Sequence, residues 1–145
     1  MIRVRRGQAD LAFDVFGTGG GGNGDGRAGR ADGVLLHAGV CDRRGWGGLV
    51  DALTNAGHRV VAFDRRGFGE TVYVPEPHSP VEDTLAVLAA AGMGRVVAIG
   101  NSMGGRVALD LALAHPDRVE ALVLIGTAVR GAPDPAESSA AVDRL

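Results

Sequence analysis

The chain of 145 residues contains no lysine, only one cysteine and no long apolar run. All 15 of its basic residues are arginines, which excludes a phosphate-binding P-loop because that loop needs a lysine. The single cysteine, Cys41, excludes an internal disulfide and a cysteine metal cluster. No apolar stretch approaches the roughly 18 residues that a membrane-spanning helix needs. We therefore expect no membrane span, no metal and no nucleotide bound by a P-loop.

The chain also has little net charge. The 15 arginines nearly balance 17 acidic residues, which leaves a net charge of −2. Such a balance gives no electrostatic reason to bind nucleic acid or anionic lipid. The basic N-terminal residues are followed by no apolar block, so we expect no secretory signal. Together with the single cysteine, this predicts a cytoplasmic protein. A hydrophobic content of 46% predicts a packed core.

Glycine, by contrast, is abundant at 24 residues, and it gathers in residues 17–33. Within this run, residues 24–29 match the glycine pattern G-x-G-x-x-G of dinucleotide-binding sites. That pattern must join a strand to a helix, whereas here it leads into a strand. We interpret the match as chance within a glycine-rich surface loop, and we expect no cofactor.

The rest of the sequence alternates between apolar strands and amphipathic helices. Strands are predicted at residues 2–6, 9–16, 34–37, 59–63, 95–99 and 119–125. Helices are predicted to begin near residues 46, 80 and 103. Continuous Val, Leu and Ile runs are typical of parallel strands that are covered on both faces. The pattern predicts an α/β fold, a three-layer α/β/α sandwich around a mostly parallel sheet of about six strands.

Residues 100–105 read Gly-Asn-Ser-Met-Gly-Gly and lie between the strand at 95–99 and the helix at 103–115. This is the pattern G-x-S-x-G in the context that a nucleophile elbow requires. So tight a turn strains the serine backbone and leaves neighbouring positions no room for side chains. It also places the Ser102 hydroxyl at a helix N-terminus, where free amides favour a developing oxyanion. The pattern predicts Ser102 as a nucleophile; the alternative is an ordinary turn with an N-cap serine.

A second signal follows the strand at 34–37. Acyl transfer needs two backbone N–H donors that point at one oxygen. Met103, which follows the predicted nucleophile, would supply one donor, and the loop that begins at His37 would supply the other. We interpret His37 as a residue that holds its own loop by hydrogen bonds rather than as a catalytic base.

The elbow, the turn at residues 37–39 and the segment Asp-Arg-Arg-Gly-Phe-Gly-Glu-Thr at 64–71 resemble the N-terminal half of the α/β-hydrolase superfamily. The resemblance covers about residues 2–130 and is strongest to compact esterase, lactonase and haloperoxidase-like members. It implies a catalytic Ser102 and an oxyanion hole formed by the amides of Gly39 and Met103. Ala38 stands where the family usually has glycine, so the first donor is either Gly39 or Val40. A serine nucleophile argues against the epoxide-hydrolase and haloalkane-dehalogenase branches, which use aspartate.

The family's acid and histidine base are not found. Members continue through a cap and two more strands, with the triad in the order Ser, Asp or Glu, His. Only His115 follows Ser102, and 13 helical residues place it about 20 Å away. His58 is expected at the opposite edge of the sheet, and His78 is expected at the active edge without a clear role as base.

The acids give no clearer partner. Asp110 lies on the same helix as Ser102, some 12 Å along its axis. Asp134 follows the last strand at the active edge, although it also suits the N-cap of a further helix. Asp64 is interpreted as the anchor of its own turn.

These departures predict an incomplete hydrolase fold. We expect residues 1–130 to form the N-terminal part of the hydrolase core and residues 131–145 to begin a cap or lid helix that is cut short. The strand at 119–125 would then be an exposed apolar edge, a possible surface for self-association.

Three functions are compatible with this sequence. The first is a serine hydrolase for small esters or lactones, nearly inactive as this truncated chain. The second is a non-catalytic module on a hydrolase-like fold that binds a small ligand or a partner. The third is a hydrolase completed by a second polypeptide.

Overall fold

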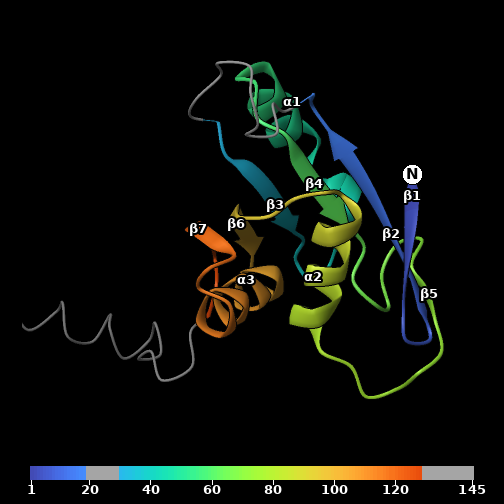
Figure 1. Ribbon diagram of the computed structural model, residues 1–145. Helices are drawn as coiled ribbons and strands as arrows, with labels where there is room; N and C mark the ends of the chain where they lie inside the picture. The colour runs from blue at the N-terminus through green and yellow to red at the C-terminus, as the bar shows by residue number, and fades with distance from the viewer. Residues whose placement is uncertain (19–29, 129–145) are drawn as a thin grey trace, which may run out of the picture.

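The computed structural model describes residues 1–18 and 30–128 (Figure 1). Most of the glycine-rich run lies outside these residues. The predicted cap helix at 131–145 and the candidate acid Asp134 lie outside them as well.

Within the described residues, the chain forms one mixed sheet. Its strands are β1 (Ile2–Arg6), β2 (Ala9–Phe16), β3 (Asp32–Leu36), β4 (Val60–Phe63), β5 (Val72–Tyr73), β6 (Val96–Asn101) and β7 (Val119–Ile125). They are arranged in the order β1-β2-β4-β3-β6-β7, and β5 pairs with β2. The strands β3, β4, β6 and β7 are parallel, as predicted, whereas β1, β2 and β5 pair antiparallel.

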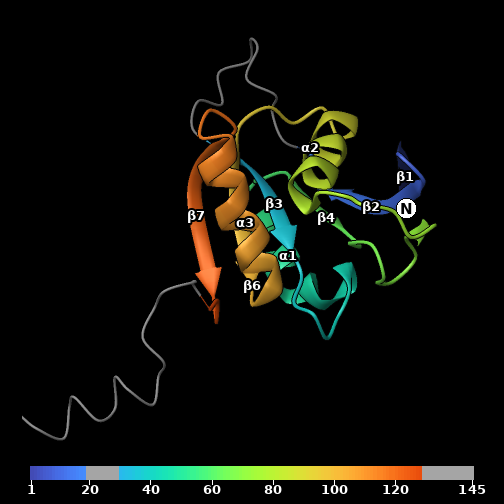
Figure 2. The same ribbon diagram turned by 90° about the horizontal axis from the view of Figure 1, so that it is seen from below.

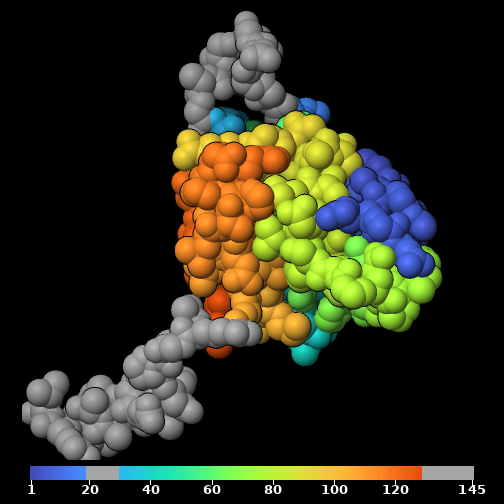
Figure 3. Space-filling model, turned by 60° about the horizontal axis from the view of Figure 1, so that its bottom comes forward, coloured from blue at the N-terminus to red at the C-terminus, as the bar shows by residue number. Residues whose placement is uncertain are grey.

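Helices cover both faces of the sheet (Figures 1 and 2). The helices are the 3-10 helix η1 (Arg43–Trp46) and the α-helices α1 (Gly47–Asn55), α2 (Pro80–Ala90) and α3 (Met103–Ala114). The helices α2 and α3 lie side by side on one face, and α1 packs on the other (Figures 2 and 3). The predicted three-layer α/β/α arrangement is confirmed.

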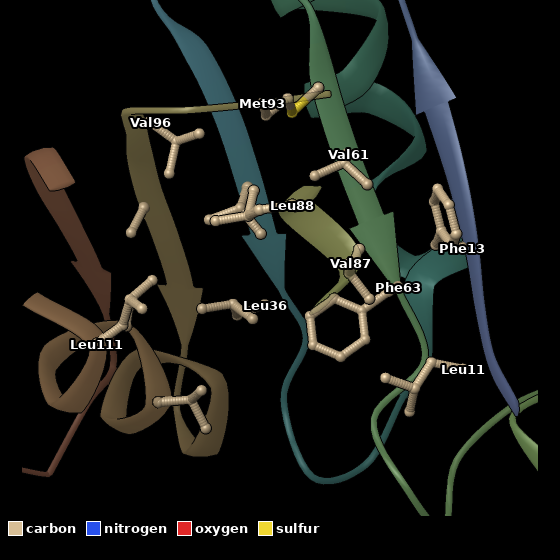
Figure 4. Close-up of a cluster of buried hydrophobic side chains, with 14 of the residues drawn as sticks. Leu11, Phe13, Leu36, Val61, Phe63, Val87, Leu88, Met93, Val96 and Leu111 are labelled. Carbon is tan, nitrogen blue, oxygen red and sulfur yellow. The ribbon is translucent and has the colours of Figure 1, made fainter. Parts of the chain in front are cut away.

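Side chains of the parallel strands point alternately to the two faces of the sheet, and they form a hydrophobic core on each face. Val34 and Leu36 of β3 face α2 and α3, whereas Leu35 between them faces α1. Successive side chains of a strand point to opposite faces, so a strand of consecutive apolar residues serves both cores. Figure 4 shows the larger core, in which side chains from the sheet meet Leu88 of α2 and Leu111 of α3.

Local capping sets the start of α2. The Ser79 side chain accepts a hydrogen bond from the backbone N–H of Glu82, and Pro80 is the first helical residue. A proline at this position loses no hydrogen bond, because the first amides of a helix have no intrahelical partner. The start of α2 therefore agrees with the helix start near residue 80 that the sequence predicts.

Two short elements were not predicted. The strand β5 has only two residues. The helix η1 is a single turn of four residues that leads directly into α1. Both are too short to produce a hydrophobic period of their own. The sheet consequently has seven strands where the sequence predicted about six.

Strand β7 lies at the edge of the sheet beside β6. Val123, Leu124 and Ile125 are 38–43% exposed. The prediction of an apolar edge at 119–125 agrees with this exposure. No helix in the described part of the chain has the length and apolar character needed to cross a membrane.

Candidate active site

Ser102 occupies the sharp turn between β6 and α3. Its φ is 51° and its ψ is −112°, and it is the one non-glycine residue with a positive φ among residues 1–18 and 30–128. Such backbone angles cost about 1–3 kcal/mol and persist only where the surroundings enforce them. The Ser102 amide donates to the oxygen of Ile125 at 2.8 Å, and its side chain is exposed and caps no amide of α3. The residue is therefore not an ordinary N-cap serine, the alternative left open by the sequence.

Two glycines allow this turn because backbone approaches their α-carbons. A Cβ on Gly100 would lie 2.4 Å from the Cα of Gly105. A Cβ on Gly104 would lie 1.9 Å from the oxygen of Leu36, at the end of β3. The first turn of α3 thus packs directly on the chain that leaves β3, which brings the start of the loop at residues 37–40 against Gly104.

The structure brings Gly39 into contact with the side chain of Met103, the two residues whose amides are the predicted oxyanion donors. A Cβ on Gly39 would lie 2.4 Å from the sulfur of Met103, so the loop and the elbow are in contact. Among the described residues, no backbone oxygen accepts a hydrogen bond from the amides of Gly39, Val40 or Met103. Ser102, Gly39 and Met103 therefore lie together at the carboxyl ends of β3 and β6, with these amides free.

His37 holds this loop in place. Its ring is fully buried, and Nε2 accepts a hydrogen bond from the Arg65 amide at 3.1 Å. The other ring nitrogen, Nδ1, must then carry the proton and donate to the oxygen of Ala38 at 2.7 Å. Burial lowers the pKa of His37 below its usual 6.5, because the neutral ring is favoured away from water. These contacts confirm the interpretation of His37 as a loop anchor.

The lowered pKa predicts a pH-dependent stability. Below about pH 6.5 the His37 side chain is protonated in the unfolded chain, whereas the buried ring of the folded chain stays neutral to lower pH. The free energy of unfolding therefore falls on acidification. The slope from this group is at most about 1.4 kcal/mol per pH unit. We expect urea unfolding between pH 5 and pH 7 to show this slope, His37→Gln to lose it and His78→Gln to keep it. Equal slopes for wild type and His37→Gln would contradict the prediction.

The other three histidines do not bond to Ser102. His58 precedes β4, and its Nδ1 lies 3.0 Å from the oxygen of Ala31 at the opposite edge of the sheet. His115 ends α3, as far along the helix as predicted. His78 is exposed, and its Nδ1 lies 3.0 Å from the oxygen of Glu76, but it lines a cavity that Met103 also lines. No histidine of the described chain contacts the Ser102 hydroxyl.

Asp64 anchors the turn after β4, as interpreted from the sequence. Its side chain is fully buried and accepts hydrogen bonds from the amides of Arg43 at 2.8 Å and Glu70 at 2.7 Å. The Arg43 guanidinium also pairs with Asp64, Glu70 and Asp14. Sequence reasoning missed Arg43, because its partners lie 21 to 29 residues away in the chain.

Nothing at this edge suggests a metal centre. Among residues 1–18 and 30–128, no group of three His, Cys, Asp or Glu side chains is arranged to hold an ion. The carboxylates near the elbow are engaged by arginines or by backbone amides. Within the described residues, the groups at the elbow that are free to act on a substrate include the Ser102 hydroxyl and backbone N–H donors.

Comparisons with known proteins identify the family to which this fold belongs. Residues 34–144 match the family described as alpha/beta hydrolase fold. A 2-hydroxy-6-oxononadienedioate/2-hydroxy-6-oxononatrienedioate hydrolase of Burkholderia vietnamiensis is 39% identical over 105 residues, which are 68% of this chain and 36% of the relative.

Two solved structures are similar throughout the chain. A thermophilic esterase from Thermogutta terrifontis is 29% identical with a TM-score of 0.73, over 99% of this chain and 52% of that one. A structure described as an N-acyl homoserine lactone degrading enzyme is 26% identical with a TM-score of 0.74, over 98% of this chain and 52% of that one. The chain thus spans about half the length of these two structures. It spans 36% of the length of the curated relative. The fold, the elbow and the family match together show that the chain belongs to the α/β-hydrolase superfamily.

Proposed function

We propose that the chain carries the nucleophile and oxyanion hole of a serine hydrolase that acts on small carboxylic esters or lactones. Ser102 is the nucleophile, and the amides of Gly39 and Met103 are the oxyanion donors. The observation that carries the proposal is the strained, exposed Ser102, whose neighbours Met103 and Gly104 lie against the loop at residues 37–40. The names of the esterase and the lactone-degrading enzyme support the substrate class.

The site suits the two halves of acyl transfer. The Ser102 oxygen attacks the carbonyl carbon, and the negative charge that develops on the carbonyl oxygen is stabilised by the free amides and by the N-terminus of α3. Collapse of this intermediate expels the alcohol and leaves an acyl-enzyme on Ser102, which water then hydrolyses to the acid. Each attack releases a proton, so both halves need a base within hydrogen-bond reach of the serine oxygen.

We infer that this chain alone turns over esters only in trace amounts. A serine without a base stays a protonated alcohol at neutral pH and is a poor nucleophile. None of the described histidines bonds to Ser102. An oxyanion hole and binding alone leave roughly 10³–10⁴-fold acceleration over water in a known triad, which is too little for useful turnover.

Labelling with a fluorophosphonate tests the nucleophile. We expect slow labelling that mass spectrometry locates at Ser102 and that free imidazole accelerates by acting as the missing base. The variant Ser102→Ala removes the attacking oxygen and should remove the label. The matched control, Ser79→Ala, removes the cap of α2 at another exposed serine and should label like wild type.

Two results would contradict the proposal. Equal labelling of wild type and Ser102→Ala would show that Ser102 is not the nucleophile. Rapid hydrolysis of p-nitrophenyl acetate that is lost in Ser102→Ala would show that the inferred trace activity is wrong.

A second candidate function is a non-catalytic module that binds a small ligand or a partner. The cavity beside Met103 and the lack of a described base at Ser102 favour it. It predicts ligand binding that Ser102→Ala leaves unchanged, together with no fluorophosphonate label even with imidazole.

We also propose that the β7 edge is a surface for self-association, because its apolar side chains are exposed. The concentration dependence of the sedimentation coefficient measures this self-association.

A cytoplasmic location is proposed from the single cysteine.

A further inference from the structure

Arg65 is a buried arginine that meets no carboxylate in the described part of the chain. The residue follows β4 and is only 9% exposed. Its Nη2 donates to the backbone oxygen of His37 at 2.9 Å, whereas its Nε is buried without a partner. The guanidinium lies 4.9 Å from the centre of the Phe68 ring. Burial lowers the pKa of Arg65, because the charged guanidinium loses contact with water.

The other buried arginines near this site are paired. Arg66 contacts Asp83 at 2.8 Å and Glu76 at 2.7 Å, and Arg43 contacts three carboxylates. An uncompensated buried charge costs free energy, whereas a paired one recovers much of that cost. The fold therefore supplies carboxylate partners to the neighbours of Arg65 and leaves Arg65 itself with a carbonyl and an aromatic ring.

Arg65 lines a cavity beside the nucleophile elbow. The cavity has a volume of about 190 Å³, and its walls include Phe63, Phe68, His78 and Met103. A cavity of about 150 Å³ holds a benzene molecule, so this space accepts a ligand of at least that size. Met103 directly follows Ser102 in the chain, so the cavity adjoins the residue next to the proposed nucleophile.

The unpaired charge favours an anionic ligand. The one carboxylate in the cavity wall, Asp83, accepts two hydrogen bonds from Arg66. Arg65 is therefore the cation of the cavity wall that is free to pair. A guanidinium binds a carboxylate through parallel N–H donors, and such charge-assisted bonds are roughly twice as strong as neutral ones.

We propose that Arg65 binds a carboxylate group of the substrate in this cavity and so selects anionic esters or lactones over neutral ones. This inference rests on the proposed hydrolase function, because that function makes the cavity a substrate site. Arg65 acts here as a specificity residue and takes no part in the bond-breaking steps.

Binding of butanoate and of its neutral counterpart butanamide to the 145-residue chain tests the proposal. The two molecules have almost the same shape, so the difference between them measures the charge. We expect butanoate to bind at least about tenfold more tightly, since hydrogen bonds to a charged group are roughly twice as strong as those to a neutral one. In ¹H–¹⁵N spectra the amides of Phe68 and Met103 should shift with butanoate.

Two charge-removing variants complete the experiment. Arg65→Gln should abolish the preference for butanoate, whereas Arg44→Gln, which removes an arginine whose side chain is 72% exposed, should retain it. Equal affinity of wild type for the two molecules, or an undiminished preference in Arg65→Gln, would overturn the proposal. The wild-type comparison decides even if Arg65→Gln does not fold.

The outcome is separable from that of the proposed function. Fluorophosphonate labelling at Ser102 without a butanoate preference would overturn the role of Arg65 and leave the hydrolase proposal intact. A butanoate preference without labelling would support the anion site and contradict the nucleophile.

Discussion

Gly104→Ala is expected to lower the free energy of unfolding by about 3 kcal/mol or more, at the upper end of what overpacking costs. The added methyl group would lie 1.9 Å from the oxygen of Leu36 and 2.6 Å from that of His37. Both are backbone atoms in or next to a buried strand, so neither can turn aside as the end of a flexible side chain would. Relief requires α3 to move away from β3, which separates the elbow from the loop at residues 37–40. Urea unfolding followed by circular dichroism measures the loss.

Gly48→Ala is the matched control. Gly48 lies in α1 with no atom within 4 Å of an added Cβ, and it is exposed. Alanine in a helix is favoured over glycine by roughly 0.5–1 kcal/mol, so this variant should be slightly more stable than wild type. If Gly104→Ala unfolds within 0.5 kcal/mol of wild type, the close contact between α3 and β3 is not a constraint on the elbow.

The elbow could be predicted from the sequence because the turn itself is local in the chain. The turn and the strain at Ser102 lie within residues 100–105, and a Cβ on Gly100 would meet backbone atoms of Gly104 and Gly105, so a short motif carries this information. The contact that requires glycine at position 104 comes from Leu36 and His37, and only the fold shows it. The parallel strands were predictable for a related reason. Strands such as Val60–Phe63 are buried on both faces, and burial on both faces requires an apolar residue at every position. This requirement appears in the sequence as a run of consecutive apolar residues.

The groups that support the site could not be predicted in this way. Arg43 reaches Asp14 and Asp64 across 29 and 21 residues of chain, and no local pattern encodes such a pairing. The isolation of Arg65 is equally hidden, because Arg65 and Arg66 are neighbours in sequence and only the fold gives one of them carboxylates. Partners that are distant in the sequence determine which arginines form structural ion pairs and which remain available to bind a ligand.

Asp64→Asn is expected to produce the second large loss, roughly 3–5 kcal/mol of the free energy of unfolding. Oδ1 accepts from the Arg43 amide, and Oδ2 accepts from the Glu70 amide and from the Arg43 guanidinium. An asparagine has the same shape, but one of its two ends is an NH₂ group that would face an N–H donor. The substitution also leaves the buried Arg43 with one carboxylate fewer. Urea unfolding measures the change.

Asp10→Asn separates this effect from the loss of a surface charge. Asp10 pairs with Arg5 at 3.2 Å, and both side chains are largely exposed at 41% and 64%. Exposed ion pairs contribute about 0–1 kcal/mol, because water screens them and two flexible side chains must be ordered. Asp64→Asn should therefore be destabilised several times more than Asp10→Asn. Similar losses in the two variants would mean that the turn after β4 does not depend on Asp64, and the loops around Ser102 would have to be held by other contacts, such as those between His37 and Arg65.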